Sequence, residues 1–291
     1  MAQCILCGGH ETRKVFREKQ YDLLSCQACE LLFIDPYPES MADVHDKVVD
    51  DSYDDLEVLN AEKHHAAGAR FYDSVFPQIE PELQGMSSVL DVGCGTGQLL
   101  VRIGREFPQM RRAGIELSRS RAAMAREKAG CDIMEIPIEE FRGEDRYDVV
   151  TLINVLSHIP SLDALFGAVR SMLNPGGKFI IRAGEHRSDI QKSDIFDWGI
   201  PSHLHFLGLK TIDFISKKYG FRITRHLRQP YSAYRFARST WLQPGRSAKR
   251  NVIKKIVAYT PGALPILKAL YDRRHGQRIY TSLIVLTPVE A

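Results

Sequence analysis

From residue 87 onward, short apolar runs alternate with helical stretches, and this alternation restricts the fold more than any other feature of the sequence. The apolar runs predict strands at Ser88–Val92, Ala113–Leu117, Ile133–Ile136, Tyr147–Asn154, Lys178–Ala183, Phe221–Leu227 and Ile279–Leu286. Helices are expected between them, near 97–107, 119–129, 161–173 and 209–219. Buried strands that alternate with helices form a mostly parallel sheet covered on both faces. The sequence therefore predicts an α/β fold with a doubly wound, mostly parallel, seven-stranded sheet.

The first of these strands runs into a glycine-rich turn, with the sequence VLDVGCGTG over residues 89–97. Glycine lets the backbone approach a ligand closely, because a side chain would collide there. The glycines stand at 93, 95 and 97, whereas the dinucleotide fingerprint GxGxxG would need its third glycine at Gln98. The carboxyl group of Asp91, inside the strand, favours a ligand with an ammonium group over a pyrophosphate.

A second acidic residue, Glu116, stands at the end of the next predicted strand. It follows the glycine turn by about 20 residues, the spacing at which an acid can accept both hydroxyls of a ribose. The turn and this acid together predict a nucleoside site at the carboxyl edge of the sheet.

Asp91 to Gly97, taken with Glu116, resemble the first two motifs of the class I S-adenosylmethionine-dependent methyltransferases. The resemblance covers roughly residues 87–227, and Asn174-Pro175-Gly176-Gly177 matches the turn before the family's fifth strand. It implies S-adenosylmethionine as cofactor. It also implies that the cofactor contacts come from Asp91, Gly93, Cys94, Gly95, Gly97, Glu116, Leu117, Ile138, Glu139 and Asn154.

Within that set, the resemblance gives each part a different role. The glycine turn would lie against the methionine and ribose, Glu116 would hold the ribose hydroxyls, and Leu117 would pack on the adenine. Ile138 and Glu139 would contact the adenine, although Pro137 stands where the family commonly has an acid. Asn154, at the end of the fourth strand, would lie near the sulfonium end of the cofactor.

Methyl transfer is an in-line displacement at an activated methyl group, so alignment and desolvation can supply much of the acceleration. A general base is needed only where the acceptor must lose a proton. Histidine has a pKa suited to that step near neutrality. The candidates are His158, which follows the fourth strand, and His203 and His205, which follow the fifth. For each of them, a purely structural role stays open.

Four of the six cysteines form two CxxC pairs, Cys4/Cys7 and Cys26/Cys29, with 18 residues between the pairs. This spacing is typical of a zinc ribbon, in which two tight turns bring four thiolates to one ion. Four cysteine ligands leave no open coordination position, so a structural zinc ion is expected. His10 is an alternative ligand.

A zinc module ahead of this domain is similar to a group of methyltransferases that act on nucleotide-linked deoxysugars. The residues that carry this likeness are Asn154-Val155-Leu156 with His158, and His203-Leu204 with Phe206. The sequence departs from the group at Pro201 and Ser202, where the group has a histidine and a glutamate. The predicted acceptor is therefore a small molecule such as a sugar or natural-product intermediate, and O, N and C all stay open as the methylated atom.

Charge and hydropathy narrow the other function classes. The chain has 39 basic and 36 acidic residues, a net charge of +3, which argues against a dedicated nucleic-acid binder and leaves a local basic patch open. No apolar stretch approaches 18 residues and the first residues lack a signal-peptide pattern, so a cytoplasmic location is expected. Two alternatives remain: an RNA or protein methyltransferase, and a cofactor-binding scaffold without catalysis.

The predicted organisation has three parts. Residues 1–35 form the zinc-binding knot, 36–85 a linker with helical cover that includes a helix over 64–76, and 86–291 the methyltransferase domain. That domain carries a basic helical insert at about 228–278, with the sequence KRNVIKKIV from Lys249. The insert is interpreted as an amphipathic helix packed on the domain, with a substrate lid, a dimer contact and contact with an anionic surface as alternatives.

Overall fold

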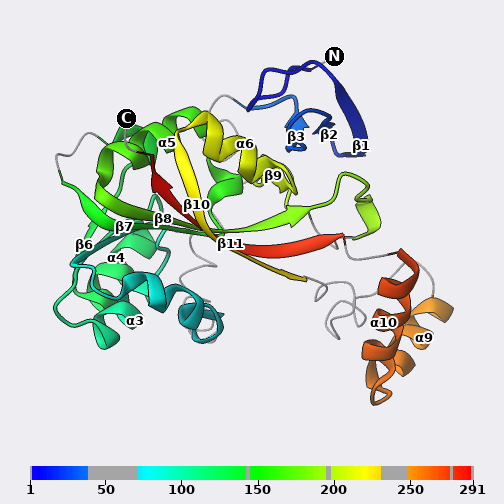
Figure 1. The fold of residues 1–291 in the computed structure, drawn as a ribbon. Coiled ribbons are helices and arrows are strands. Elements are labelled where there is room, and N and C mark those ends of the chain that lie inside the picture. Colours follow the sequence, from blue (N-terminus) through cyan, green and yellow to red (C-terminus); the bar gives the residue numbers. More distant parts are fainter. Residues whose placement is uncertain are drawn as a thin grey trace. The chain divides into compact units, whose positions relative to one another are not determined.

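The computed structural model describes residues 2–38, 71–141, 145–194, 198–230, 248–275 and 278–289. Figure 1 shows the described helices and strands, coloured along the sequence. The chain divides into two compact units. The core unit comprises Tyr37–Ala183, Ile212–Leu227 and Ser282–Ala291. The ribbon unit comprises Met1–Pro36, Gly184–Thr211 and Arg228–Thr281. Each unit is described by itself below.

Five parallel strands form the centre of the core unit. They are β4 (Ser88–Val92), β5 (Arg111–Ile115), β6 (Asp132–Met134), β7 (Tyr147–Ile153) and β8 (Leu173–His186). Their order in the sheet is β6-β5-β4-β7-β8, and every neighbouring pair is parallel. The chain therefore winds outward from β4 in both directions, and the carboxyl ends of β4 and β7 form the switch point at which such sheets bind ligands.

Two further strands extend this sheet next to β8. β11 (Ile279–Pro288) pairs with β8, and β10 (Phe221–Pro230) pairs with β11. All seven strands predicted from the apolar runs are present, with bounds that shift by a few residues. The prediction of a doubly wound, mostly parallel α/β sheet is thus confirmed, but within the described residues the sheet has 11 strands where seven were predicted, because a further strand also pairs with β8.

The helices of the core unit follow the predicted alternation. They are α3 (Gln98–Glu106), α4 (Arg119–Ala129), α5 (Leu162–Met172) and α6 (Thr211–Lys218). Residues 71–83 are helical too, while residues 64–70 of the predicted helix over 64–76 lie outside the described residues. Side chains of this helix, of α3 and of the strands pack into one apolar core that includes Val75, Ile103, Val89, Val149 and Ile180.

The ribbon unit contains four strands that the apolar runs did not predict. They are β1 (Thr12–Glu18), β2 (Tyr21–Cys26), β3 (Leu32–Asp35) and β9 (His205–Gly208). They form an antiparallel array in the order β1-β2-β3-β9, and β9 pairs in parallel with Glu185 and His186 at the end of β8. The N-terminal strands are thereby joined to residues more than 170 positions further along the chain, as in the pairing of Leu32 with Phe206.

Two helices of the predicted basic insert lie in the ribbon unit. They are α9 (Ala248–Tyr259) and α10 (Ala263–His275), while residues 231–247 and 276–277 of the insert lie outside the described residues. Several large apolar side chains of both helices are exposed. No helix within the described residues is long and apolar enough to cross a membrane.

Candidate functional site

The glycine turn between β4 and α3 has a backbone that only glycine adopts without strain. Gly93, Gly95 and Gly97 have φ angles of 70°, 57° and 81°, in the left-handed region. A Cβ atom on Gly93 would also lie 2.5 Å from Cγ2 of Val155, which follows β7. The turn is thus packed closely against the end of β7, at the switch point of the sheet.

The backbone amides of this turn are already engaged within the protein. The amides of Gly93 and Cys94 donate to the carbonyl oxygen of Ile115, at 2.8 and 3.0 Å. The amide of Gly95 donates to Oε2 of Glu116 at 2.8 Å. A pyrophosphate bound by these amides would have to break all three hydrogen bonds, so the geometry favours a ligand that lies over the turn without a phosphate.

Glu116 is held firmly and still has capacity to bind a ligand. Its Oε1 accepts from the amide of Ser118 at 2.9 Å, opposite the bond between Oε2 and Gly95. Each carboxylate oxygen has two lone pairs, so each can accept one further hydrogen bond. Two oxygens so oriented suit a pair of ribose hydroxyls. The neighbouring Leu117 is 55% exposed and offers an apolar surface beside them.

Asp91 is buried within β4 with one carboxylate oxygen satisfied. Thr151 on β7 donates its hydroxyl to Oδ1 at 2.6 Å. Among the described residues, Oδ2 has no hydrogen-bond partner although it is buried. Burial raises the pKa of the Asp91 carboxyl to about 7. A buried acceptor without a partner is costly, so a cationic or ammonium group of a ligand would stabilise the ionised form.

Asn154 ends β7 in a conformation that its neighbours stabilise. Its φ angle is 61°, which is uncommon for a residue other than glycine. Arg182 on β8 donates from Nη1 to Oδ1 of Asn154 at 2.6 Å, and its carbonyl accepts from the Asn154 amide at 2.9 Å. The same guanidinium lies over the ring of Phe71, 4.8 Å from the ring centre. Arg182 therefore holds the predicted sulfonium end of the site.

Sequence reasoning missed Thr151, Arg182 and Tyr72 in this region. Thr151 and Arg182 stand on predicted strands near Asp91 and Asn154, so strand register was the signal that could have found them. Tyr72 is placed by a helix outside the resemblance. Burial raises the pKa of its phenol, and the nearby carboxyl of Asp91 adds to this effect.

The remaining predicted cofactor residues differ in what their side chains can reach. The Cys94 side chain is 2% exposed and packs in an apolar cluster with Leu100, so a ligand could meet only its backbone. Ile138 and Glu139 lie in the short helix η1 (Ile138–Glu140), with Ile138 buried and Glu139 half-buried. Those two residues stay predicted contacts.

The three candidate bases fall in different units. His158 ends the short helix η2 (Leu156–His158) directly after β7, in the core unit. His203 and His205 lie in the ribbon unit, where His205 is buried in β9. His203 is half-buried, and its Nδ1 is 2.9 Å from the carbonyl oxygen of Trp198.

An aromatic cluster surrounds this part of the ribbon unit. The rings of Trp198 and Phe206 are 5.1 Å apart, and His203 lies edge-on to Phe206 at 5.8 Å. The ring of His186, at the end of β8, lies 5.7 Å from Trp198. Burial lowers the pKa of His186 to about 4, so its imidazole is neutral at physiological pH.

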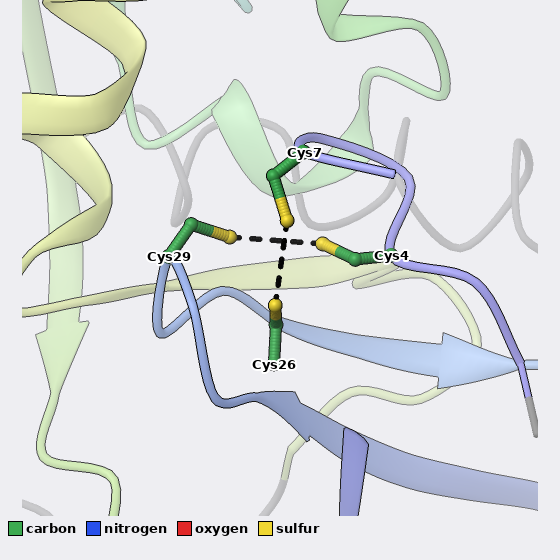
Figure 2. Close-up of side chains that lie close together, drawn as sticks. All are labelled: Cys4, Cys7, Cys26 and Cys29. Carbon is green, nitrogen blue, oxygen red and sulfur yellow. Dashed lines mark hydrogen bonds between the residues drawn. The ribbon is translucent and has the colours of Figure 1, made fainter. Parts of the chain in front are cut away.

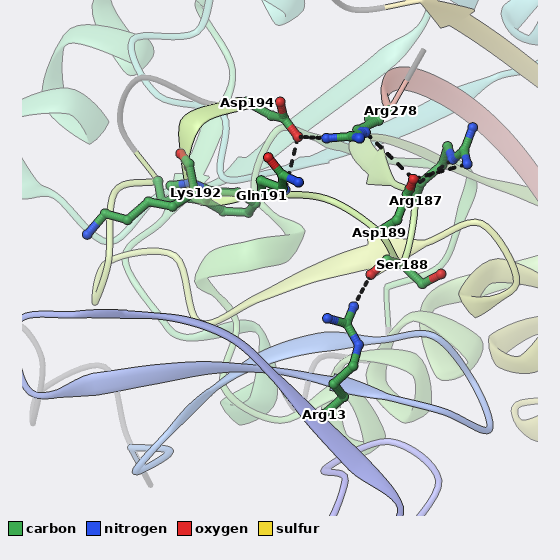
Figure 3. Close-up of polar contacts among 9 residues, drawn as sticks. Arg13, Arg187, Ser188, Asp189, Gln191, Lys192, Asp194 and Arg278 are labelled. Carbon is green, nitrogen blue, oxygen red and sulfur yellow. Dashed lines mark hydrogen bonds and ion pairs between the residues drawn. The ribbon is translucent and has the colours of Figure 1, made fainter. Parts of the chain in front are cut away.

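Charged side chains fix the segment 187–194 that precedes the aromatic cluster (Figure 3). Arg278 forms an ion pair with the buried carboxylate of Asp194, at 3.0 Å. Arg13 of β1 donates to the carbonyl oxygen of Ser188. Segment 187–194 is thus anchored both to β1 and to Arg278, the residue before β11, within the ribbon unit.

The four predicted metal ligands converge in the ribbon unit (Figure 2). Their sulfur atoms all lie within 4.8 Å of one another, with Cys4 and Cys29 at 3.6 Å and Cys7 and Cys26 at 3.4 Å. These separations are too long for disulfides. The hydrogen bond from Cys29 lowers the pKa of the Cys4 thiol to about 5. The arrangement forms a cluster that could hold a metal ion.

Comparison with known proteins identifies the domain that the chain carries. A family model described as a methyltransferase domain matches residues 61–226, more than half of the chain. The ubiquinone biosynthesis O-methyltransferase of Acinetobacter baylyi is 31% identical over 97 residues, which cover 31% of this chain and 40% of the relative. That of Pasteurella multocida is 32% identical over 105 residues, covering 31% and 43%. The chain thus spans about two-fifths of the length of these curated relatives.

Solved structures share the fold at low sequence identity. A putative sarcosine dimethylglycine methyltransferase from Galdieria sulphuraria has a TM-score of 0.52 and 19% identity, covering 76% of this chain and 85% of that one. An O-methyltransferase from a trans-AT PKS multienzyme of Brevibacillus brevis, in complex with S-adenosyl-L-homocysteine, has a TM-score of 0.51 and 16% identity, covering 80% and 78%.

The family match, the shared fold and the turn that meets Glu116 at the switch point agree with one another. The chain belongs to the methyltransferase-domain family and carries a class I S-adenosylmethionine-dependent methyltransferase domain.

Proposed function

We propose that this protein transfers a methyl group from S-adenosylmethionine to a small-molecule acceptor, a sugar or natural-product intermediate. The observation that carries the proposal is the carboxylate of Glu116, fixed by two backbone amides beside the glycine turn. The names of the relatives and of the solved structures above support a small acceptor.

The residues present fit the cofactor at both of its ends. Glu116 has one acceptor position per carboxylate oxygen for the ribose hydroxyls, and the exposed Leu117 offers an apolar surface for the adenine. The buried Oδ2 of Asp91 suits the ammonium group of the methionine part. When bound, the cofactor supplies a methyl group that is already activated for displacement. The chain's task is then to bind, align and exclude water.

Arg182 and Asn154 would position the reacting end of this site. Their hydrogen bonds lock the backbone at the end of β7 in its left-handed conformation. A turn fixed in this way loses little entropy when a ligand binds. His158 stands four residues after Asn154, at the end of η2, and is the candidate base within the core unit.

His203 is the second candidate base, and its hydrogen bond favours the tautomer that a base requires. The carbonyl oxygen of Trp198 can only accept, so in the neutral imidazole of His203 the proton is on Nδ1 and the lone pair on Nε2. A half-buried imidazole in this state can take a proton from an acceptor hydroxyl or amine. His205, buried in β9, is the third candidate, and a structural role in the strand is the competing interpretation.

The four cysteines would bind one structural zinc ion. Tetrahedral zinc with bonds of about 2.3 Å places its sulfur ligands about 3.8 Å apart, close to the 3.4 and 3.6 Å observed here. With four thiolates bound, no position is open for catalysis. A reducing compartment keeps such thiols available to the metal, so we place the protein in the cytoplasm.

Transfer of a labelled methyl group tests the proposed reaction. Purified protein would be incubated with methyl-labelled S-adenosylmethionine together with one acceptor pool at a time. The pools are sugar nucleotides, small metabolites, RNA and protein. The proposal predicts label in a small-molecule pool. Label in RNA or protein would replace it with a macromolecular acceptor. Cofactor binding without label in any pool would indicate a scaffold that binds the cofactor without turnover.

A further inference from the structure

Helices α9 and α10 expose an unusual amount of apolar surface. Among the described residues, eight large apolar side chains are exposed, and six of them lie in these two helices. Each of the six is between 58% and 61% exposed: Val252, Ile253, Ile256, Tyr259, Ile266 and Leu270. Exposed apolar groups gathered in this way mark a surface that contacts another body.

The exposed residues of α9 occupy one face of the helix. Ile253, Ile256 and Tyr259 follow one another at three-residue steps, and Val252 stands four residues before Ile256. This spacing places all four on one side of the helix. The opposite face carries Ala258, which is 7% exposed. Helix α9 thus buries one face and presents a wide apolar face to solvent.

Helix α10 exposes a narrower apolar face. Ile266 and Leu270 are four residues apart and therefore lie above one another on the helix surface. Arg273, three residues beyond Leu270, is exposed on the same side. Lys255 is likewise exposed one turn before Tyr259 in α9. Cationic side chains therefore stand at the margins of both apolar faces.

The charge of this hairpin opposes that of the remaining chain. Residues 248–275 contain seven basic residues and one acidic residue, which gives +6, whereas the complete chain carries +3. The remainder is therefore −3. An apolar face with a concentrated positive charge is the composition of a helix that lies in the interface of an anionic bilayer.

We infer that the α9–α10 hairpin docks the protein onto a lipid surface that carries anionic headgroups. The apolar faces of the two helices enter the boundary between headgroups and acyl chains. Their lysine and arginine side chains extend toward the lipid phosphates. Neither helix is long and apolar enough to cross the bilayer, so both lie along it. A second copy of the chain fits less well, because two hairpins of +6 repel each other.

Vesicle flotation with the full-length protein tests this inference. The probes are vesicles of phosphatidylcholine alone and vesicles of equal parts phosphatidylcholine and phosphatidylglycerol. One variant removes apolar groups, Val252→Ser/Ile253→Ser/Ile256→Ser, and another removes charge, Lys255→Gln/Arg273→Gln. Matched controls change exposed residues elsewhere: Val289→Ser, and Arg105→Gln/Lys128→Gln. Circular dichroism establishes that each variant is folded.

The wild-type protein and both controls should float with the anionic vesicles and stay behind with phosphatidylcholine alone. The apolar variant should bind at least about tenfold more weakly, and the charge variant should weaken binding by a similar factor. Raising NaCl from about 0.1 M to about 0.5 M should weaken the binding of wild-type protein to the anionic vesicles, since salt screens the charges.

Three results would overturn the inference. The first is no binding of folded wild-type protein to the anionic vesicles. The second is binding that the folded hairpin variants retain in full. The third is a hairpin-dependent dimer in light scattering, or hairpin-dependent binding of RNA, in a protein that does not float; either would assign the surface to a different partner.

Discussion

At the scale of single residues, the two acids of the site have different surroundings. Glu116 is held by two backbone amides, whereas the buried Asp91 has only the hydroxyl of Thr151 on one oxygen. Both acids were identified from the sequence, because Asp91 lies inside one recognisable strand and Glu116 stands at the end of the next. Thr151 was not, because its role depends on the register that sets it beside Asp91, 60 residues away in the chain.

The buried carboxyl of Asp91 should make the stability of the unliganded protein depend on pH. Its pKa of about 7 lies above that of an exposed aspartate, so the folded state binds the proton more tightly than the unfolded state. Stability from this group is present at low pH and falls as pH rises from about 4 through about 7, by up to about 4 kcal/mol.

The variant Asp91→Asn should remove this decline and unfold at higher urea concentration than wild type at about pH 8. Urea unfolding of both proteins at about pH 5 and about pH 8 measures the effect. Free energies of unfolding that change with pH by the same amount in both proteins would contradict the assignment.

His203 should matter for turnover more than for cofactor binding. If Nε2 accepts a proton from the acceptor, His203→Ala should lower kcat by about 10²-fold or more and leave the cofactor Kd unchanged. The pH profile of kcat should also lose its acidic limb. Steady-state kinetics with the acceptor found by label transfer would show this. An unchanged kcat would remove His203 as the base.

At the scale of elements, the quality of the sequence prediction followed the apolar content of the strands. Strands β4 and β7 of the core unit are buried along almost their whole length and read as continuous apolar runs. All seven predicted strands are present in the structure. Most residues of β1 are polar, and the strand is exposed or half-buried along its length. β9 has only four residues. Such strands are defined by their pairing, as of β3 with β9, and not by their own composition.

The cysteine turns beside β1 and β3 should depend on zinc. Wild-type protein should contain about one zinc ion per chain, and Cys26→Ser should lose it, because three thiolates leave the tetrahedral site open. Cys131→Ser, outside the cluster, is the matched control and should keep the metal. Atomic absorption gives the zinc content. A wild-type protein without zinc, or a Cys26→Ser variant with full occupancy, would refute the metal site.

At the scale of the whole molecule, the two compact units combine segments that lie far apart in the sequence, whereas the three predicted parts are continuous stretches of it. Residues 1–36 form one compact unit with 184–211 and 228–281. This grouping comes from pairings between distant segments, such as β3 with β9, and from ion pairs such as that of Arg228 with Glu185 at 2.7 Å. A local sequence pattern does not reveal contacts between segments so far apart in the chain. The boundary of the methyltransferase domain at residue 86 stays a prediction.

The most direct test of the central claim is calorimetric titration of the purified protein with S-adenosylhomocysteine. The account predicts a Kd in the micromolar range for wild type and for Glu127→Gln, a control on the exposed surface of α4. Glu116→Gln should bind about tenfold to about a hundredfold more weakly, since the ribose loses a charged acceptor worth about 1.5–3 kcal/mol. No binding to wild type, or equal affinity of folded Glu116→Gln, would contradict the assignment of this site.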